Sequence, residues 1–174
     1  MMELSFMDTI KGLDACVYVG TTGTQAAISI PSLLYGDTPF SGKLADTIPY
    51  SFDYSPAVYS SWFEKNGYTN TPDSGGGVDY VEGIYVGYRY YETAAADGYI
   101  DYDTTVQFPF GYGLSYTNFD WEVEKTELGD IGGTINIDVK VTNTGSTYSG
   151  KEIVQVYYSA PDSAEAEKEY QELG

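Results

Sequence analysis

The stretch FPFGYGLSYTNF, residues 108–119, decides the fold, because two kinds of sequence meet there. Mixed helix and strand patterns precede it, and alternating β-strand sequence follows it directly. Gly111 and Gly113 allow a tight backbone on which bulky side chains converge. Four aromatic side chains supply area for burial: Phe108, Phe110, Tyr112 and Tyr116. We interpret the stretch as a structural joint between two domains.

The sequence after the joint alternates between apolar and polar side chains, as half-buried strands do. Three segments follow this rule: 119–124, 135–141 and 151–158. The charged stretch 163–174 looks like a loop entering a fourth strand. An immunoglobulin-like or fibronectin-like sandwich needs about seven strands in about 100 residues. Residues 117–174 are therefore predicted to form an incomplete β-sandwich, whose exposed edges pair with something or associate.

The first half of the chain contains a strand-turn-helix pattern. Leu13–Gly20 is a short apolar run, which predicts a strand followed by a turn rich in glycine and threonine. Residues 25–35 have helical spacing, and Gly36 is placed to end that helix. Pro31 kinks the helix, unless the helix begins at Pro31. The one cysteine, Cys16, lies in the apolar run, so we expect a buried, inert thiol.

A second string, EGIYVGYRYYET at residues 82–93, predicts a strand over Val81–Tyr91, because its bulky residues alternate in parity. Gly83 and Gly87 share one face of that strand. Glycine weakens a strand interior, so we expect another backbone or a ligand to approach that face closely.

The composition excludes several function classes. The chain has 8 Lys plus Arg against 26 Asp plus Glu, a formal charge of −18, which repels nucleic acid and anionic membranes. No apolar run approaches the roughly 20 residues that span a bilayer, so we expect a soluble protein. The chain has no histidine, which excludes Ser/His/Asp and Cys/His catalysis and the usual zinc sites.

We expect no metal and no cofactor. The acidic stretch 97–103 does not have the ligand spacing of an EF-hand loop, so we interpret it as a solvated connection between strands rather than a calcium site.

The strings at 82–93 and 108–119 together resemble the end of a glycoside hydrolase family 3 enzyme, the β-glucosidase family. Residues 141–161 closely resemble a stretch of the fibronectin type III-like domain of that family, and 41–44 match a turn of its α/β domain. The sequence departs from the family pattern at three places, where it has Phe40, Glu169 and the long loop at about 50–77.

The resemblance implies a fold class of α/β followed by β. Residues 1–116 correspond to the last part of an α/β sandwich domain, and 117–174 to a truncated fibronectin type III-like domain. In this family the nucleophile is an aspartate of an N-terminal TIM barrel, and the acid/base is usually a glutamate from earlier in the α/β domain. Neither lies in this sequence, so we assign no catalytic residue here. The implied partners are a β-glucoside or oligosaccharide substrate and the missing barrel domain.

Glu82, Arg89 and Trp62 are the candidate substrate-proximal residues. A carboxylate accepts and a guanidinium donates hydrogen bonds, so Glu82 or Arg89 could border a sugar pocket. The alternative is a buried pair of Arg89 with a carboxylate that pins the strand. On a regular strand Glu82 and Arg89 lie on opposite faces and do not pair. Trp62, with Tyr59 and Phe63, either stacks on a sugar ring or packs its loop onto its own domain.

Two alternatives to a retaining exo-acting β-glucosidase stay open. β-Xylosidases and other exo-glycosidases share the C-terminal organisation. A non-enzymatic carbohydrate-binding or surface module fits the 19 tyrosines and the acidic charge, but it leaves the strand-turn-helix unit unexplained. Residues 1–14 lack the basic start and apolar stretch of a secretory signal, and a missing upstream part would hide one, so the compartment stays open between cytoplasmic and secreted.

Overall fold

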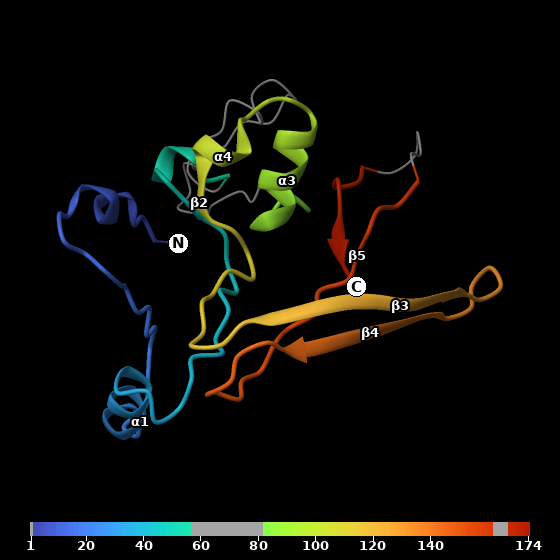
Figure 1. The fold of residues 1–174 in the computed structure, drawn as a ribbon. Helices are drawn as coiled ribbons and strands as arrows, with labels where there is room; N and C mark the ends of the chain where they lie inside the picture. Colours follow the sequence, from blue (N-terminus) through green and yellow to red (C-terminus); the bar gives the residue numbers. More distant parts are fainter. Residues whose placement is uncertain (1, 57–81, 162–166) are drawn as a thin grey trace. The chain divides into compact units, whose positions relative to one another are not determined.

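The computed structural model describes residues 2–56, 82–161 and 167–174, drawn in colour in Figure 1. The chain divides into two compact units, each built from more than one segment. Unit 1 comprises Met1–Cys16, Lys43–Tyr112 and Gln155–Gly174, and unit 2 comprises Val17–Gly42 and Gly113–Val154. Both helices and strands are present, as the sequence predicts. The domain boundary at residue 116 stays a prediction.

Unit 1 consists of short elements joined by turns. Its helices are η1 (Ser5–Thr9), η2 (Phe52–Tyr54), α3 (Tyr88–Ala96) and α4 (Tyr102–Thr105). Its strands are β1 (Ile48–Pro49), β2 (Val106–Phe108), β5 (Tyr157–Tyr158) and β6 (Glu172–Leu173). β1 pairs with β2 and β5 with β6, both antiparallel.

The core of unit 1 lies on one side of α3. Tyr90, Tyr91 and Ala94 follow helical spacing on that side and are buried together with Tyr85 and Val106. Gly98 ends the helix at a φ of +69°, which places the Tyr99 amide 2.8 Å from the Ala94 carbonyl. Burial of aromatic side chains around α3 therefore holds unit 1 together.

The predicted strand over Val81–Tyr91 is wrong, because Tyr88 to Tyr91 begin α3 and a turn precedes them. Gly83 and Gly87 have φ angles of +54° and +60°, which lie in the left-handed region and interrupt an extended chain. The same aromatic residues are also compatible with helical spacing, because Tyr90, Tyr91 and Ala94 lie on the buried side of α3. The two glycines thus form a turn and a helix start, not a close approach to a strand.

The acidic stretch 97–103 is exposed at its aspartates, as predicted, but it connects two helices and not two strands. The Asp101 carboxylate accepts hydrogen bonds from the amides of Asp103 and Thr104, at 3.1 and 3.3 Å. Asp101 is therefore the N-cap of α4.

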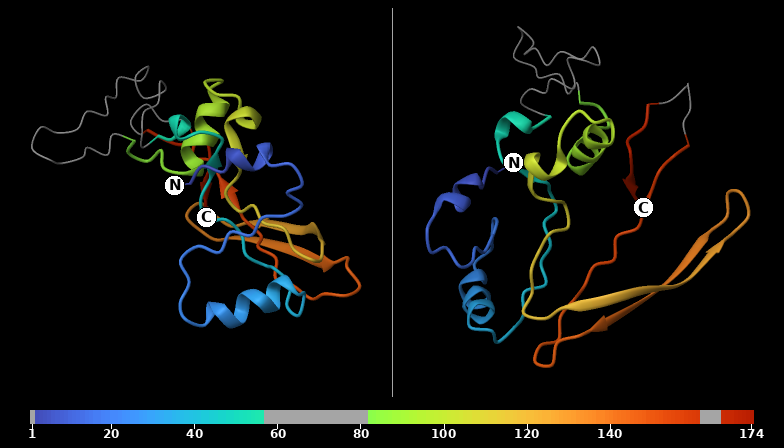
Figure 2. Two further views of the ribbon diagram at one scale, coloured as in Figure 1. Left: turned by 90° about the vertical axis from the view of Figure 1, so that its left-hand side faces the viewer. Right: turned by 45° about the horizontal axis from the view of Figure 1, so that its top comes forward.

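Unit 2 contains α1 (Ala26–Leu34) and the antiparallel pair β3 (Phe119–Leu128) and β4 (Ile135–Asn143). The predicted helix is confirmed, and Gly36 follows it at a φ of +80°. Pro31 lies inside the helix, so the alternative in which the helix begins at Pro31 is wrong. Figure 2 shows β3 and β4 as a long two-stranded ribbon.

Two expectations for the first half are wrong. Leu13–Gly20 has no regular structure, and Cys16 is exposed. A strand needs a neighbouring strand with which it exchanges backbone hydrogen bonds. In the part of the chain that the structure describes, no strand pairs with Leu13–Gly20. Without a neighbouring strand, an apolar run such as Val17–Val19 stays about 40% or more exposed.

The predicted strands of the second half are confirmed in part. The first two correspond to β3 and β4, and β3 extends four residues beyond the predicted end. Of the predicted strand 151–158 only Tyr157–Tyr158, β5, is paired. β6 lies inside the stretch 163–174, which the sequence predicts to be a loop entering a fourth strand.

Candidate functional site

The turn before α3 places the two described candidates, Glu82 and Arg89. The Tyr85 amide donates to the Glu82 carbonyl at 2.8 Å, and Gly83 and Gly87 bend the chain on either side. Glu82 is buried, with 8% of its surface exposed. Arg89 lies in the first turn of α3, and about a third of its side chain is exposed. The predicted substrate contacts of both residues stay proposals.

Arg89 pairs with two carboxylates of the C-terminal segment. Its Nη2 donates to Glu172 Oε1 at 2.7 Å, and its Nε lies 3.4 Å from Glu169 Oε1 without hydrogen-bond geometry. The guanidinium also lies 5.7 Å from the centre of the Tyr88 ring. The expected pairing of Arg89 with a carboxylate is confirmed, but the Arg89 and Glu172 side chains are about a third exposed rather than buried, and the pair holds a helix rather than a strand.

Three hydrogen bonds extend this contact along α3. The Tyr85 hydroxyl donates to the Lys168 carbonyl at 3.1 Å. The Tyr170 amide donates to Thr93 Oγ1 at 2.9 Å, and the Leu173 amide donates to the Tyr88 hydroxyl at 2.8 Å. We call these bonds and the Arg89 ion pairs the C-terminal seam. No local sequence pattern indicates the C-terminal seam, because its partners lie about 80 residues apart in the chain.

Aromatic rings pack beside the seam. The Tyr88 ring centre lies 5.0 Å from that of Phe110 and 5.7 Å from that of Tyr157. Phe108 packs on Tyr112 at 5.1 Å. The predicted burial of the four aromatic residues of the joint is confirmed only in part, because Phe108 and Phe110 are half-buried while Tyr112 and Tyr116 are 38% and 43% exposed.

Four tyrosines of unit 1 are weaker acids than a free tyrosine. Burial raises the pKa of Tyr91 and Tyr102 well above the usual value of 10. Burial also raises the pKa of Tyr157, and the hydrogen bond from the Tyr158 hydroxyl to Glu172 raises that of Tyr158. All four phenols are therefore protonated at neutral pH and do not act as bases.

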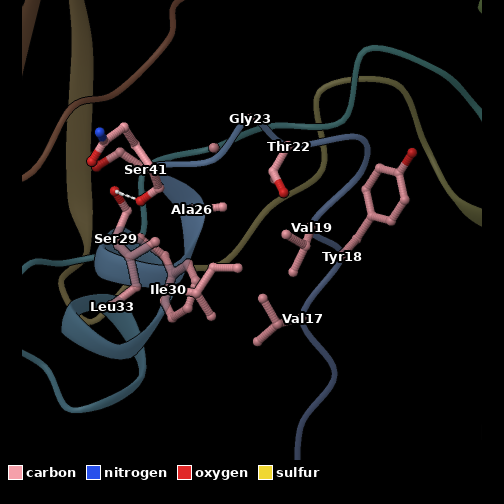
Figure 3. A pocket seen from close by; sticks show the side chains of 13 residues that line it. Val17, Tyr18, Val19, Thr22, Gly23, Ala26, Ser29, Ile30, Leu33 and Ser41 are labelled. Carbon is pink, nitrogen blue, oxygen red and sulfur yellow. Dashed lines mark hydrogen bonds between the residues drawn. The ribbon is translucent and has the colours of Figure 1, made fainter.

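Unit 2 has an open pocket of about 510 Å³ between residues 17–19 and α1. Figure 3 shows Val17 and Val19 on one side of it and Ile30 and Leu33 of α1 on the other. Ser29 Oγ is already used, since it donates to the Gln25 carbonyl at 3.4 Å. None of the described residues that line the pocket carries a carboxylate, so this lining lacks the pair of acidic groups that glycoside hydrolysis uses.

Trp62, Tyr59 and Phe63 lie outside the described residues. Over ranges 2–56, 82–161 and 167–174, no group of three or more His, Cys, Asp or Glu side chains is placed to hold a metal ion. No helix in these ranges has the length and apolar character to cross a bilayer.

Comparison with known proteins identifies the family. No protein-family model matches the chain. The thermostable β-glucosidase B of Acetivibrio thermocellus is 37% identical over 160 residues, which cover 90% of this chain and 18% of the relative. A β-glucosidase structure from Paenibacillus barengoltzii matches with a TM-score of 0.63 and 40% identity, over 84% of this chain and 14% of that one. The chain is a homologue of one part of the family 3 β-glucosidases.

Other matches give the range of related activities. The structure of the Kluyveromyces marxianus β-glucosidase in complex with glucose has a TM-score of 0.64 and 38% identity, over 83% of this chain and 15% of that one. An exo-α-(1→6)-L-arabinopyranosidase of Bifidobacterium breve is 36% identical over 164 residues, 94% of this chain and 18% of the relative. The chain thus spans less than a fifth of the length of these β-glucosidases and of the arabinopyranosidase.

Proposed function

We propose that this chain is the C-terminal portion of an exo-acting β-glucosidase and supports the substrate pocket of a catalytic apparatus supplied elsewhere. The observation that carries the proposal is the 37% identity to a β-glucosidase over 90% of the chain, in a match that covers only 18% of that enzyme. The described residues agree with a supporting role, because the Arg89 guanidinium is held by carboxylates of its own chain.

The finer parts of the proposal concern mechanism and architecture. A retaining mechanism uses two carboxyl groups about 5–5.5 Å apart, one as nucleophile and one as acid/base. We infer that an N-terminal TIM barrel and an earlier part of the α/β domain contribute them. The β3–β4 ribbon is the start of a fibronectin type III-like sandwich in this proposal, since its strands alternate as the inner and outer faces of a sandwich do.

Substrate contact is proposed for two of the candidates. Glu82 is buried before α3, where a carboxylate can accept hydrogen bonds from sugar hydroxyls or from a neighbouring domain. Trp62 is a stacking candidate by residue type alone. For Arg89 we favour the structural role, because both carboxylates of the seam already neutralise it.

A second exo-glycosidase activity has specific support. The Bifidobacterium breve relative is named an exo-α-(1→6)-L-arabinopyranosidase and is 36% identical to this chain. Similarity over this part of the protein therefore does not fix the sugar. No observation favours the non-enzymatic module, since the relatives compared above carry enzyme names.

The test is a paired assay. Two proteins are purified: the 174-residue chain, and the product of the longest open reading frame that contains it in frame. Each is incubated with aryl β-glucoside, aryl β-xyloside and aryl α-L-arabinopyranoside. We expect hydrolysis by the longer protein alone, fastest with the glucoside. The same longer protein without residues 82–174 controls for contaminating glycosidases. Hydrolysis by the 174-residue chain itself would overturn the proposal, as would a longer frame that encodes no glycosidase.

A further inference from the structure

Glu82 is a buried carboxylate at the start of the turn before α3. Its residue is 8% exposed, and within the part of the chain that the structure describes its carboxylate has no hydrogen-bond or ion-pair partner. A buried carboxylate is costly unless it accepts hydrogen bonds, and hydroxyl groups are donors of the required kind. The position of this carboxylate therefore decides how well a hydroxyl-bearing ligand can bond to it.

Tyr85 connects the turn of Glu82 to the C-terminal segment. The Tyr85 amide donates to the Glu82 carbonyl at 2.8 Å, which closes the turn. The Tyr85 side chain is 6% exposed and packs in the core of unit 1. Its hydroxyl donates to the Lys168 carbonyl at 3.1 Å. One buried aromatic side chain thus ties the backbone of Glu82 to the backbone of Lys168.

Arg89 fixes the other end of the same turn. The turn ends at Gly87, the N-cap of α3, and Arg89 follows two residues later. The Arg89 guanidinium bonds the Glu172 carboxylate at 2.7 Å. Residues 168–173 are therefore tied to both ends of the turn 82–87.

Glu172 is itself held from a second side. One of its carboxylate oxygens accepts from Arg89, and the other accepts from the Tyr158 hydroxyl at 2.8 Å. Tyr158 also faces Glu172 across the β5–β6 pair. Because Glu172 is fixed from β5, it can hold Arg89 in place instead of following it. Residues 168–173 belong to the predicted fibronectin-like part of the sequence, and they lie in unit 1 together with α3.

We propose that Tyr85 and Arg89 are positioning residues for the Glu82 carboxylate, so that residues 168–173 help to set the geometry of the sugar pocket. The inference rests on the proposed function, in which Glu82 contacts substrate in the longer protein. Binding groups work when they are held within about 0.5 Å of their productive position, and a misplacement of about 1 Å can cost about 100-fold in rate. Tyr85 and Arg89 need not touch the sugar for this role.

Kinetics of the longer protein test the proposal. The variants Glu82→Gln, Tyr85→Phe and Arg89→Met are assayed with its preferred aryl glycoside, at a temperature where circular dichroism shows each variant to be folded. Glu82→Gln is expected to raise KM roughly tenfold or more, because it removes the charge from a hydrogen-bond acceptor. Tyr85→Phe and Arg89→Met are expected to raise KM about threefold to tenfold, with kcat changed less than about twofold.

Two further variants separate positioning from stability. Tyr85→Phe added to Glu82→Gln is expected to raise KM no further, because the charged group that Tyr85 positions is already gone. Arg89→Lys keeps the positive charge and is expected to recover part of the affinity that Arg89→Met loses. The matched control is Tyr35→Phe, which removes a hydroxyl from a tyrosine that is 87% exposed and should leave KM unchanged.

The outcomes separate this inference from the proposed function. A longer protein that hydrolyses none of the three aryl glycosides would overturn the proposed function and the inference with it. An active parent whose KM is unchanged in Glu82→Gln, or in both Tyr85→Phe and Arg89→Met, would overturn the inference alone. The same conclusion would follow if Tyr85→Phe raised KM equally with and without Glu82→Gln.

Hydrogen exchange in the 174-residue chain gives a readout that needs no activity. The Tyr85 amide donates to the Glu82 carbonyl, so its protection reports the turn directly. It is expected to lose protection in Arg89→Met and to keep it in Tyr35→Phe. Unchanged protection in Arg89→Met would overturn the positioning role of Arg89.

Discussion

Arg89→Met tests whether the C-terminal seam holds unit 1. Methionine keeps the apolar stem of the side chain but removes the guanidinium, which bonds Glu172 at 2.7 Å and lies 3.4 Å from Glu169. A hydrogen bond to a charged group contributes about 1.5–3 kcal/mol when buried, and an exposed ion pair about 0.2–1 kcal/mol. Because the Arg89 side chain is 32% exposed, we expect a loss of about 1–2 kcal/mol.

The assay combines global and local unfolding. For a chain of this length, that loss lowers the midpoint of thermal unfolding by roughly 3–6 °C. Hydrogen exchange reports the seam itself, since the amides of Tyr170 and Leu173 donate to Thr93 and Tyr88. Both amides are expected to lose protection in Arg89→Met.

Lys125→Met is the control for Arg89→Met, because Lys125 pairs with Glu127 on an exposed strand with both side chains more than half exposed. We expect less than about 0.5 kcal/mol for that change. Equal losses in the two variants, or unchanged protection at Tyr170 and Leu173, would refute the role that we give to the seam.

Four further predictions concern Tyr91, Gly87 and Cys16. Tyr91→Phe removes a buried hydroxyl with no hydrogen-bond partner among the described residues, so urea unfolding should show unchanged stability or a gain of up to about 1 kcal/mol; a loss above 1 kcal/mol contradicts this. Burial raises the pKa of Tyr91, so the folded state disfavours its phenolate and the free energy of unfolding falls as the pH rises above about 10. Alkaline unfolding should therefore begin at higher pH in Tyr91→Phe, and an unchanged onset would contradict this prediction. Gly87→Ala places a side chain at a φ of +60° and should cost about 1–2 kcal/mol in a thermal melt, against a few tenths of a kcal/mol for the exposed control Glu124→Ala. The exposed Cys16 should react with a thiol reagent in the native chain as fast as in urea, whereas slow native reaction means that it is buried.

The sequence predicts those elements whose pattern is local. β3 and β4 are amphipathic strands, and α1 has helical spacing that ends at Gly36, so each could be read from a short window. The partner of Arg89 was predicted only by type, as a carboxylate. Its identity depends on a contact across 83 residues, which a local pattern does not contain.

Two errors have separate physical causes. Over Val81–Tyr91 aromatic residues favour a strand by propensity, but the positive φ angles of Gly83 and Gly87 produce a turn and a helix start. Leu13–Gly20 has strand composition, yet a strand exists only with a paired neighbour, which the described residues do not provide. Composition therefore indicates the intrinsic strand propensity of a segment, but not whether its backbone conformation or a neighbouring strand allows a strand to form.

The most direct test of the account is a graft. In the Kluyveromyces marxianus β-glucosidase, of which the structural match covers 15%, the matched segment is replaced by the corresponding residues of this chain. Deletion of the segment is the control. If this chain is the C-terminal portion of such an enzyme, the graft hydrolyses an aryl β-glucoside and the deletion does not. A graft that folds, as judged by circular dichroism and a cooperative melt, but does not turn over the substrate would contradict the account.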